Sequence, residues 1–252
     1  MGLYKVLKQV RFGQARRFDN IYLPSKRFNE KLSDDHIYVN SAVEQVDSIL
    51  NYCTLNKDTR ILDFGCGQGR FANGLIMRFS DFGNYCGIDT DVKAIKWCNR
   101  WINRFHPNFT FHHVDAHNAR YNPSSKSRQS LPLKAGSYDI AFLNSVFSHM
   151  LSDDVEFYLE QMHKALGKKG IMYVTAFIEE NVPQFEENPE GYLDRRSLGP
   201  LHRVRYEKSF FISLFEKARF NILDFQHQKI ERTKQSVLVA KKTDDPWIKH
   251  VQ

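Results

Sequence analysis

The stretch Ile61-Leu62-Asp63-Phe64-Gly65-Cys66-Gly67-Gln68-Gly69-Arg70 joins an apolar run to three alternating glycines. Its first half predicts a short buried strand, and the apolar periodicity of residues 71–79 predicts a helix behind it. Glycine lets the backbone turn sharply and approach a ligand closely, and the first turn of a helix offers free amide groups. We therefore expect a strand–turn–helix unit that holds a nucleotide-like or amino-acid-like ligand at the carboxyl end of a parallel strand.

Strand and helix patterns alternate on both sides of this stretch. Strands are predicted at 60–64, 84–88, 109–114, 138–144, 171–177, 221–228 and 236–240, and helices at 38–53, 71–79, 92–105, 155–166 and 210–220. Gly167 is expected to end the fourth of these helices. Repeated strand–helix–strand units indicate a parallel sheet with helices on both faces. Residues 229–235 leave no room for a helix, so the last two strands should form an antiparallel hairpin.

Two classes of cofactor bind turns of this kind, and the acidic residues help to separate them. The dinucleotide pattern G-x-G-x-x-G fails, because a match that begins at Gly65 requires glycine where the chain has Arg70. Asp89 ends the next predicted strand 24 residues after Gly65, and its carboxylate suits the ribose hydroxyls of either cofactor class. Asp63 does discriminate, since a carboxylate beside the turn favours a ligand with an ammonium and a sulfonium group over a pyrophosphate.

The same residues resemble motif I of the class I S-adenosylmethionine-dependent methyltransferases, whose pattern is roughly [VIL]-L-[DE]-x-G-x-G-x-G. Residues 61–69 match it without departure, and further matches follow in the family's order at Gly87-Ile88-Asp89, Val114-Asp115-Ala116, 137–145 and 166–170. Lys169 stands where the family has proline, in a turn that only reverses the chain. Over roughly residues 38–242 the resemblance implies an α/β, doubly wound, Rossmann-like sheet of seven strands, mostly parallel with an antiparallel seventh strand, and helices on both faces.

The resemblance also implies an enzyme that binds S-adenosyl-L-methionine. The residues at the matching positions are Asp63, Gly65, Cys66, Gly67, Gly69, Asp89, Thr90, Asp115, Ala116, Asn144 and Ser145. In the family, the residue at the position of Asp89 holds the ribose and the residue at Asp115 holds the adenine amino group. Taken singly, Asp63 could merely cap the glycine loop and Asp115 could be a turn residue, but three acids at strand ends in the family's order are hard to explain by chance.

His149 is the leading candidate for a catalytic base. It follows the fourth strand of the motif order, where the family places methionine and substrate, and imidazole can accept a hydroxyl proton near neutral pH. Residues 145–151 and the acids behind them resemble a branch of small-molecule and sugar methyltransferases. The alternative is a histidine that packs under the cofactor or caps the next helix. The [DN]-P-P-[YF] pattern of enzymes that methylate DNA base amines is missing here, so DNA is not expected as a partner.

Residues 179–205 are expected to form a substrate lid inserted into the methyltransferase domain. The candidate substrate residues here and after the fourth strand are Phe147, Tyr192, Arg195, His202, Arg205 and Tyr206. Arginine grips a carboxylate or phosphate with two hydrogen bonds, so this mixture suits a small-molecule acceptor that carries anionic groups or a sugar. For any single residue, a solvated surface role is the simpler interpretation.

The net charge of +7 lies almost entirely in residues 1–31, whose net charge is +6. We divide the chain into a basic N-terminal arm (1–36), the methyltransferase domain (37–242) and a C-terminal tail (243–252). Apolar residues at 3, 6, 7 and 10 predict a short amphipathic helix in the arm, either packed on the domain or in contact with a membrane surface.

The remaining composition narrows the class of protein. No apolar run reaches the roughly 18 residues of a transmembrane helix. Four cysteines without a C-x-x-C pair indicate reduced thiols in the cytoplasm, and no spacing predicts a metal site. The chain carries no sign of its oligomeric state.

Three functions stay open on this evidence. The first is O-methylation of a small molecule, such as a sugar or a secondary metabolite. The second is methylation of RNA or protein, which the basic arm favours. The third is a non-catalytic scaffold with the methyltransferase fold, against which the intact glycine turn argues.

Overall fold

The computed structural model describes residues 11–12, 15–24, 34–79, 81–194 and 196–243. The chain forms two compact units, the first made of residues up to Thr59 with Cys66–His113 and the second of Arg60–Gly65 with the residues from Val114 onward. The helix expected at 3–10 and the tail beyond Thr243 lie outside the described residues.

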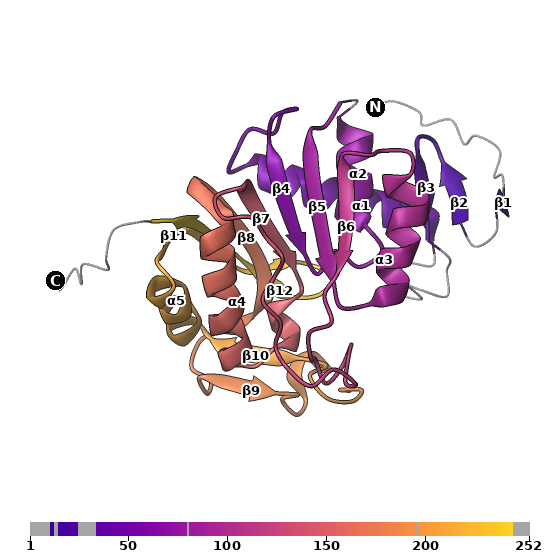
Figure 1. Ribbon diagram of the computed structural model, residues 1–252. Coiled ribbons are helices and arrows are strands. Elements are labelled where there is room, and N and C mark those ends of the chain that lie inside the picture. Colours follow the sequence, from indigo (N-terminus) through magenta and orange to yellow (C-terminus); the bar gives the residue numbers. More distant parts are fainter. Residues whose placement is uncertain (1–10, 13–14, 25–33, 80, 195, 244–252) are drawn as a thin grey trace. The chain divides into compact units, whose positions relative to one another are not determined.

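The second unit contains a sheet with the strand order β11-β12-β8-β7-β4. Its strands are β4 (Arg60–Phe64), β7 (Tyr138–Asn144), β8 (Leu166–Glu179), β11 (Phe220–Ile230) and β12 (Gln235–Lys242). β4, β7 and β8 run parallel, whereas β12 is antiparallel to both of its neighbours, as expected for the last hairpin. The helices α4 (Ser152–Ala165) and α5 (Lys208–Lys217) lie beside each other on one face of this sheet (Figure 1).

Continuous apolar runs explain why these strands are buried on both faces. Ile140, Ala141, Phe142 and Leu143 of β7 are each at most 2% exposed. A strand with one solvated face would alternate polar and apolar residues, so this run requires cover on both sides.

The end of α4 differs from the expectation. The helix stops at Ala165 because Leu166 is already extended, with φ −73° and ψ 140°, and β8 begins there. Gly167 therefore lies within the strand and does not adopt the positive φ of a helix-ending glycine. The prediction that Gly167 terminates the helix was wrong. Leu166, one residue earlier, already pairs with Tyr138 as part of β8, and this pairing ends the helix.

From Asp35 onward, the described part of the first unit contains two parallel strands and three α-helices. These elements are β5 (Asn84–Asp89), β6 (Phe109–His113), α1 (Asp35–Leu50), α2 (Arg70–Arg78) and α3 (Val92–Cys98), which continues into the π-helical turn η3 (Asn99–Asn103). The predicted helix 92–105 is thus present as an α-helical segment followed by a π-helical turn. None of the described helices has the length and apolar character needed to cross a bilayer.

Part of the expected N-terminal arm is a small sheet of the strands β1 (Arg11–Phe12), β2 (Ala15–Phe18) and β3 (Ile21–Leu23). Ile21 and Leu23 are each 1% exposed, and the Tyr22 ring stacks on Phe105 with 4.8 Å between ring centroids. The described part of the arm is therefore built into the core of the first unit. No pattern in its short, charged strands predicted this sheet.

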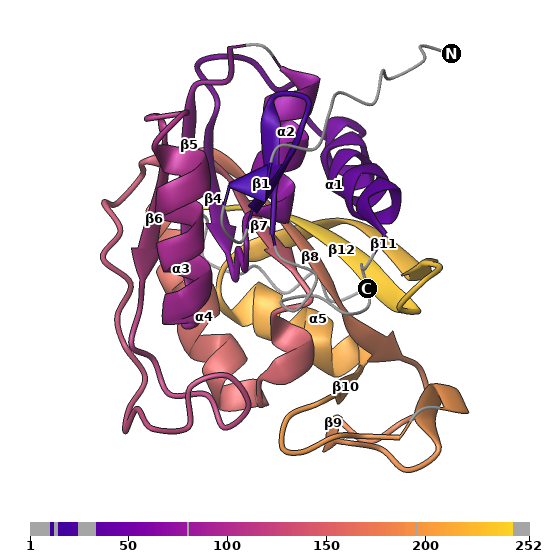
Figure 2. The same ribbon diagram turned by 90° about the vertical axis from the view of Figure 1, so that its right-hand side faces the viewer.

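α1 and α2 pack side by side at unusually close range (Figure 2). A Cβ at Gly74 of α2 would stand 2.2 Å from the backbone oxygen of Ala42 in α1. Next to it the buried Asn73 amide donates to Tyr22 O and to the Tyr38 hydroxyl, both at 3.0 Å. Glycine at position 74 is what allows the two helix backbones to approach.

We predict that Gly74→Ala destabilises the protein by about 2 kcal/mol or more, because overpacking against backbone atoms forces the helices apart. The measurement is the free energy of unfolding from urea titration followed by circular dichroism. Gly167→Ala is the matched control, since its nearest neighbours would be at 3.6 Å, and should change the free energy by less than about 0.5 kcal/mol. Equal stability of the two variants would contradict the packing argument.

Candidate functional site

In the first unit, the glycine turn is tied to the end of β5. Gly67 N donates to Asp89 Oδ2 at 2.7 Å, and Cys66 N donates to Ile88 O at 3.1 Å. Asp89 Oδ1 accepts from Asp91 N at 2.8 Å. The two oxygens of this carboxylate retain further lone pairs, so Asp89 can accept additional hydroxyl donors.

Burial raises the pKa of Asp89, while the two backbone amides lower it in part. A desolvated carboxylate that already accepts amide protons is suited to ligand hydroxyls, because it forms stronger hydrogen bonds than a solvated one. The backbone oxygen of Thr90, the next residue, accepts a hydrogen bond from His113 Nε2 at 3.2 Å.

Gly67 leaves room for a ligand. Its φ is +52°, and no atom lies within 4 Å of the point where a Cβ would stand. Gly69, with φ +71° before α2, instead faces the Ile102 side chain at 2.4 Å from such a Cβ. An open backbone at Gly67 beside the carboxylate of Asp89 fits a ribose-bearing cofactor.

In the second unit, Asp63 is buried within β4 at 2% exposure, and Gly65 ends that strand with φ +80°. A Cβ at Gly65 would stand 2.5 Å from Val146 Cγ2, so the residues after β7 pack directly on the turn. Asp115 is exposed and accepts from Asn122 Nδ2 at 2.8 Å, and the same amide donates to the backbone oxygen of the buried Ala116 at 3.1 Å.

The residues after β7 are held by a buried polar network. Ser145 has φ 62°, a left-handed conformation that is costly for a residue other than glycine. Its backbone N donates to Thr175 Oγ1 at 2.8 Å, and its hydroxyl accepts from Gln235 Nε2 at 2.7 Å. Thr175 Oγ1 also lies 3.3 Å from Asn144 Oδ1.

Gln235 connects this network from the start of β12. Its Nε2 reaches Ser148 Oγ at 3.2 Å, and its Oε1 lies 2.9 Å from Thr175 Oγ1. Ser148 and Thr175 are 0% exposed and Gln235 is 3% exposed. Because the glutamine is some 90 residues away in sequence from the turn that it holds, no local pattern could identify it.

His149 lies at the end of the 3-10 turn η4 (Phe147–His149), with Nδ1 2.9 Å from the backbone oxygen of Leu201. A carbonyl oxygen can only accept, so Nδ1 carries the proton and Nε2 carries the lone pair. Burial is the main cause that lowers the pKa of His149 to about 4; the hydrogen bond to Leu201 O acts in the opposite direction, and electrostatic interaction with Arg120 and His202 adds to the lowering. The neutral imidazole is thus the form present at physiological pH.

The expected lid contains the strands β9 (Phe185–Glu187) and β10 (Val204–Glu207), with the short turn η5 (Tyr192–Asp194) between them. β10 pairs in parallel with the end of β8 and antiparallel with β9, next to the end of β8 in Figure 2. The segment expected to form the lid is therefore continuous with the sheet, and it places the Leu201 carbonyl beside His149.

The six residues predicted to contact the substrate lie in different environments. Phe147 and Tyr206 are fully buried: Phe147 packs on Phe211, and the Tyr206 hydroxyl donates to Met150 O. They support the core and do not face a ligand. Arg195 lies outside the described residues.

The other three candidates interact within the lid or with the adjacent strands. Tyr192 OH donates to Glu179 at 2.6 Å, and the Arg205 guanidinium stacks 5.0 Å from the Tyr192 ring centroid and pairs with Glu186. His202 Nδ1 accepts from Leu198 N at 2.8 Å. These contacts order the lid.

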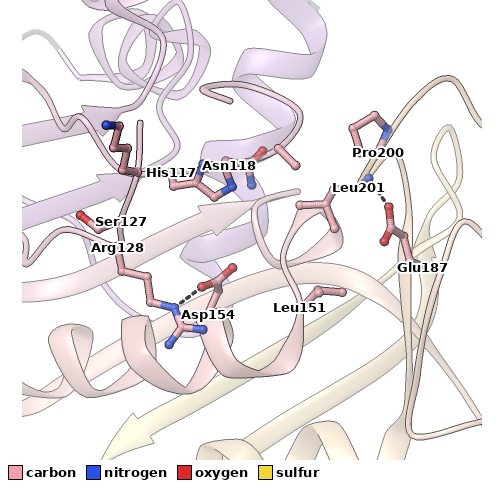
Figure 3. Close-up of a pocket in the computed structure, with 11 residues that line it drawn as sticks. His117, Asn118, Ser127, Arg128, Leu151, Asp154, Glu187, Pro200 and Leu201 are labelled. Carbon is pink, nitrogen blue, oxygen red and sulfur yellow. Dashed lines mark hydrogen bonds and ion pairs between the residues drawn. The ribbon is translucent and has the colours of Figure 1, made fainter. Parts of the chain in front are cut away.

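A pocket of about 460 Å³ opens beside the lid. It is lined by His117, Asn118, Ala119, Lys126, Ser127, Arg128, Leu151, Asp154, Glu187, Pro200 and Leu201 (Figure 3). Its volume suits a small organic molecule. Asn118 and its neighbours carry no signal in the sequence, because the segment after Ala116 resembles an ordinary polar loop.

Asn118 is the link between this loop and the candidate base. It is 7% exposed, and its Nδ2 donates to the backbone oxygen of His149 at 2.9 Å. Its Oδ1 accepts from the backbone amides of Arg120 and Tyr121 at 3.0 and 3.1 Å. The Tyr121 ring then meets the His149 ring edge-on, with centroids 5.4 Å apart.

We predict that Gln235→Ala lowers the free energy of unfolding by about 2 kcal/mol, because several buried hydroxyls lose a partner at once. Gln129→Ala is the control, since that amide is exposed and donates to Ser127 Oγ, and it should change stability by less than about 0.5 kcal/mol. Urea unfolding of both variants provides the measurement. A Gln235→Ala protein as stable as the parent would show that the network is dispensable.

Residues 55–198 match the methyltransferase domain family. A methyltransferase from Methanosarcina mazei, described as S-adenosylmethionine-dependent, has 18% identity and a TM-score of 0.53, covering 79% of this chain and 98% of that one. The 1,6-didemethyltoxoflavin-N1-methyltransferase of Burkholderia thailandensis, solved with S-adenosylhomocysteine, has 18% identity and a TM-score of 0.54, covering 83% and 80%.

The [4+2]-cyclase SpnF has the same fold at 18% identity and a TM-score of 0.56, covering 81% of this chain and 82% of that one. The expected α/β fold is therefore confirmed, and likeness of fold alone does not identify the reaction. The family match covers more than half of the chain and includes the glycine turn, Asp89 and His149. The chain belongs to the class I S-adenosylmethionine-dependent methyltransferases.

Proposed function

We propose that this methyltransferase acts on a hydroxyl oxygen of a small molecule and that His149 takes up the hydroxyl proton. The observation that carries the proposal is the hydrogen bond from His149 Nδ1 to Leu201 O, which leaves the Nε2 lone pair as the proton acceptor. The pocket of about 460 Å³ beside the lid supports a small acceptor.

S-adenosylmethionine, when bound, supplies a methyl group on a positively charged sulfur. We propose that Gly67 and Asp89 contact its ribose through the open backbone and the carboxylate described above. Asp115, held by Asn122, is proposed for the adenine amino group. Asp63, Gly65, Asn144 and Ser145 are proposed for the amino-acid part, as the family motifs imply.

A histidine whose pKa is about 4 is a weak base, but it suffices for this reaction. An alcohol oxygen that is gaining a methyl group becomes a much stronger acid than an imidazolium. The proton can therefore move to Nε2 late, as the new carbon–oxygen bond forms, without a strongly basic residue. His149 also stays neutral, so it does not oppose the positive sulfonium by charge repulsion.

Methylation of RNA or protein is the alternative that the basic N-terminal arm favoured. In the described part of the arm, Arg16 pairs with Asp35 at 2.6 Å and Arg17 donates to Asp19 O at 3.0 Å. These two cations serve the fold, which weakens this argument for a polyanionic partner. The scaffold alternative falls away because the chain belongs to an enzyme family.

We predict that Asp89→Asn weakens S-adenosylmethionine binding about 10- to 100-fold, because hydrogen bonds to a charged group are lost. Isothermal titration calorimetry measures the effect. Asp91→Asn is the control: Asp91 caps α3 through Lys93 N and Ala94 N, and asparagine caps a helix equally well. Unchanged affinity in Asp89→Asn would show that the ribose is held elsewhere.

We predict that His149→Gln lowers kcat about 100-fold or more while cofactor affinity stays within about threefold. The acceptor is first identified by comparing metabolites that differ by one methyl group in cells with and without the gene. Transfer of a labelled methyl group into RNA or protein, with no labelled small molecule, would overturn the proposed acceptor class. Full activity of His149→Gln would show that His149 is not the base.

The pH profile gives a separate prediction. The neutral imidazole is the active form, so activity that depends on His149 falls only as pH drops through its pKa of about 4, and not near 6.5. We expect kcat/KM to stay level between pH 6.5 and 5, measured in overlapping buffers on protein that remains folded. A decline centred near pH 6.5 would show that another group controls the proton transfer.

A further inference from the structure

Arg120 is a half-buried cation for which the described part of the chain supplies no carboxylate partner. Its Nη1 donates to the backbone oxygen of Leu198 at 2.9 Å. Its Nε is buried and makes no hydrogen bond to any described atom. A guanidinium in this position normally has an anion beside it, because a carbonyl oxygen solvates a positive charge but does not neutralise it.

The nearby carboxylates are already engaged elsewhere. Figure 3 shows Asp154 turned to Arg128 and Glu187 turned to the Leu201 amide. Asp115 accepts from Asn122. Asp115 and Arg128 of this loop thus have side-chain partners, whereas Lys126 is exposed to solvent. The half-buried guanidinium of Arg120 is left for a partner that is not part of this segment.

The position of Arg120 is fixed relative to the candidate base. Asn118 accepts from Arg120 N through Oδ1 and donates to His149 O through Nδ2, so one buried amide clamps the two segments. Tyr121 fills the space between them: its ring contacts the His149 ring and lies 5.5 Å from the Arg120 Cζ. A charge carried at Arg120 is therefore held close to the imidazole.

The backbone oxygen that accepts from the Arg120 guanidinium belongs to Leu198, in the segment expected to form the lid. Leu198 is 66% exposed and lies in the segment that also supplies Leu201 O to His149. Both contacts are single hydrogen bonds to backbone oxygens. A ligand that enters under this segment can therefore exchange the Leu198 carbonyl for its own oxygen atoms without breaking an ion pair.

We propose that Arg120 binds an oxyanion of the acceptor, a carboxylate or a phosphate monoester, and so selects acceptors that carry this group near the hydroxyl to be methylated. The proposal rests on the proposed function for the statement that the anion belongs to the acceptor. The planar fork of arginine matches both groups with two hydrogen bonds, whereas lysine offers only a point charge. Arg205, named from the sequence for this role, is instead paired with Glu186.

Arg120 would also couple acceptor binding to the base. Its charge contributes to the low pKa of His149. An anion that neutralises Arg120 should raise the pKa of His149, with His202 as the other charged group that acts on the ring. The base would thus become stronger only when the acceptor is in place.

The test is a titration of the full chain with inorganic phosphate and, separately, with sodium acetate. The His149 ring signal is followed by proton–carbon NMR and assigned by its loss in His149→Gln. We expect a saturable displacement of this signal, and affinity about tenfold weaker in Arg120→Gln because charged hydrogen bonds are lost. Arg120→Lys should recover part of the affinity.

Arg78→Gln is the control, because it removes a cation outside the pocket that Asp47 already pairs. It should leave the displacement unchanged, and thermal unfolding confirms that each variant is folded. A displacement with phosphate and none with acetate would identify a phosphate monoester as the group that binds. A displacement with acetate and none with phosphate would identify a carboxylate. No displacement with either anion, or an equal one in Arg120→Gln, would overturn the proposal.

The anion site at Arg120 and the base role of His149 can fail independently of each other. If His149→Gln retains full activity while anion binding still depends on Arg120, the base is wrong and the anion site stands. If His149→Gln is inactive and Arg120→Gln binds anions normally, the base stands and the anion site falls.

Discussion

The hydrogen bond between His149 Nδ1 and Leu201 O is the constraint on which the chemistry of the second unit depends. It assigns the proton to one ring nitrogen, orients the ring, and joins the turn after β7 to the lid. Three further contacts hold the two ends of this bond: the Asn118 amide to His149 O, the Glu187 carboxylate to Leu201 N, and the Gln235 network around Ser145 and Ser148. The base role proposed for His149 needs this kind of fixation, since a freely rotating imidazole would lose its orientation at each turnover.

Gly65 and Ser145 both have a left-handed backbone conformation, which the protein accommodates in different ways. Gly65 adopts a positive φ without strain, and its missing side chain makes room for Val146. Ser145 adopts a similar conformation at a cost, and two hydrogen bonds offset that cost: Ser145 N donates to Thr175 Oγ1, and Gln235 Nε2 donates to the Ser145 hydroxyl. The first arrangement is visible as a glycine pattern, whereas the second depends on residues from two distant strands.

Local periodicity was sufficient for most of the secondary structure. The strands 60–64 and 138–144 and the final antiparallel hairpin are present as expected, because buried strands in this chain are short apolar runs bounded by turns. The three-stranded arm was missed, since its stability comes from Ile21 and Tyr22 packing on other elements. The expected end of α4 at Gly167 failed because strand pairing, a tertiary interaction, takes over at Leu166.

By itself, the sequence determined the class of protein and its cofactor, since a glycine turn between a strand and a helix and acids at strand ends are local features with a strong motif signal. It also singled out His149 as a candidate base by its position after a strand. Only the tertiary structure decided which nitrogen carries the proton, that Phe147 and Tyr206 are core residues, and that Arg120 is a cation without a carboxylate partner among the described residues. Each of these depends on contacts between residues far apart in the chain, which burial and hydrogen bonding fix only after folding.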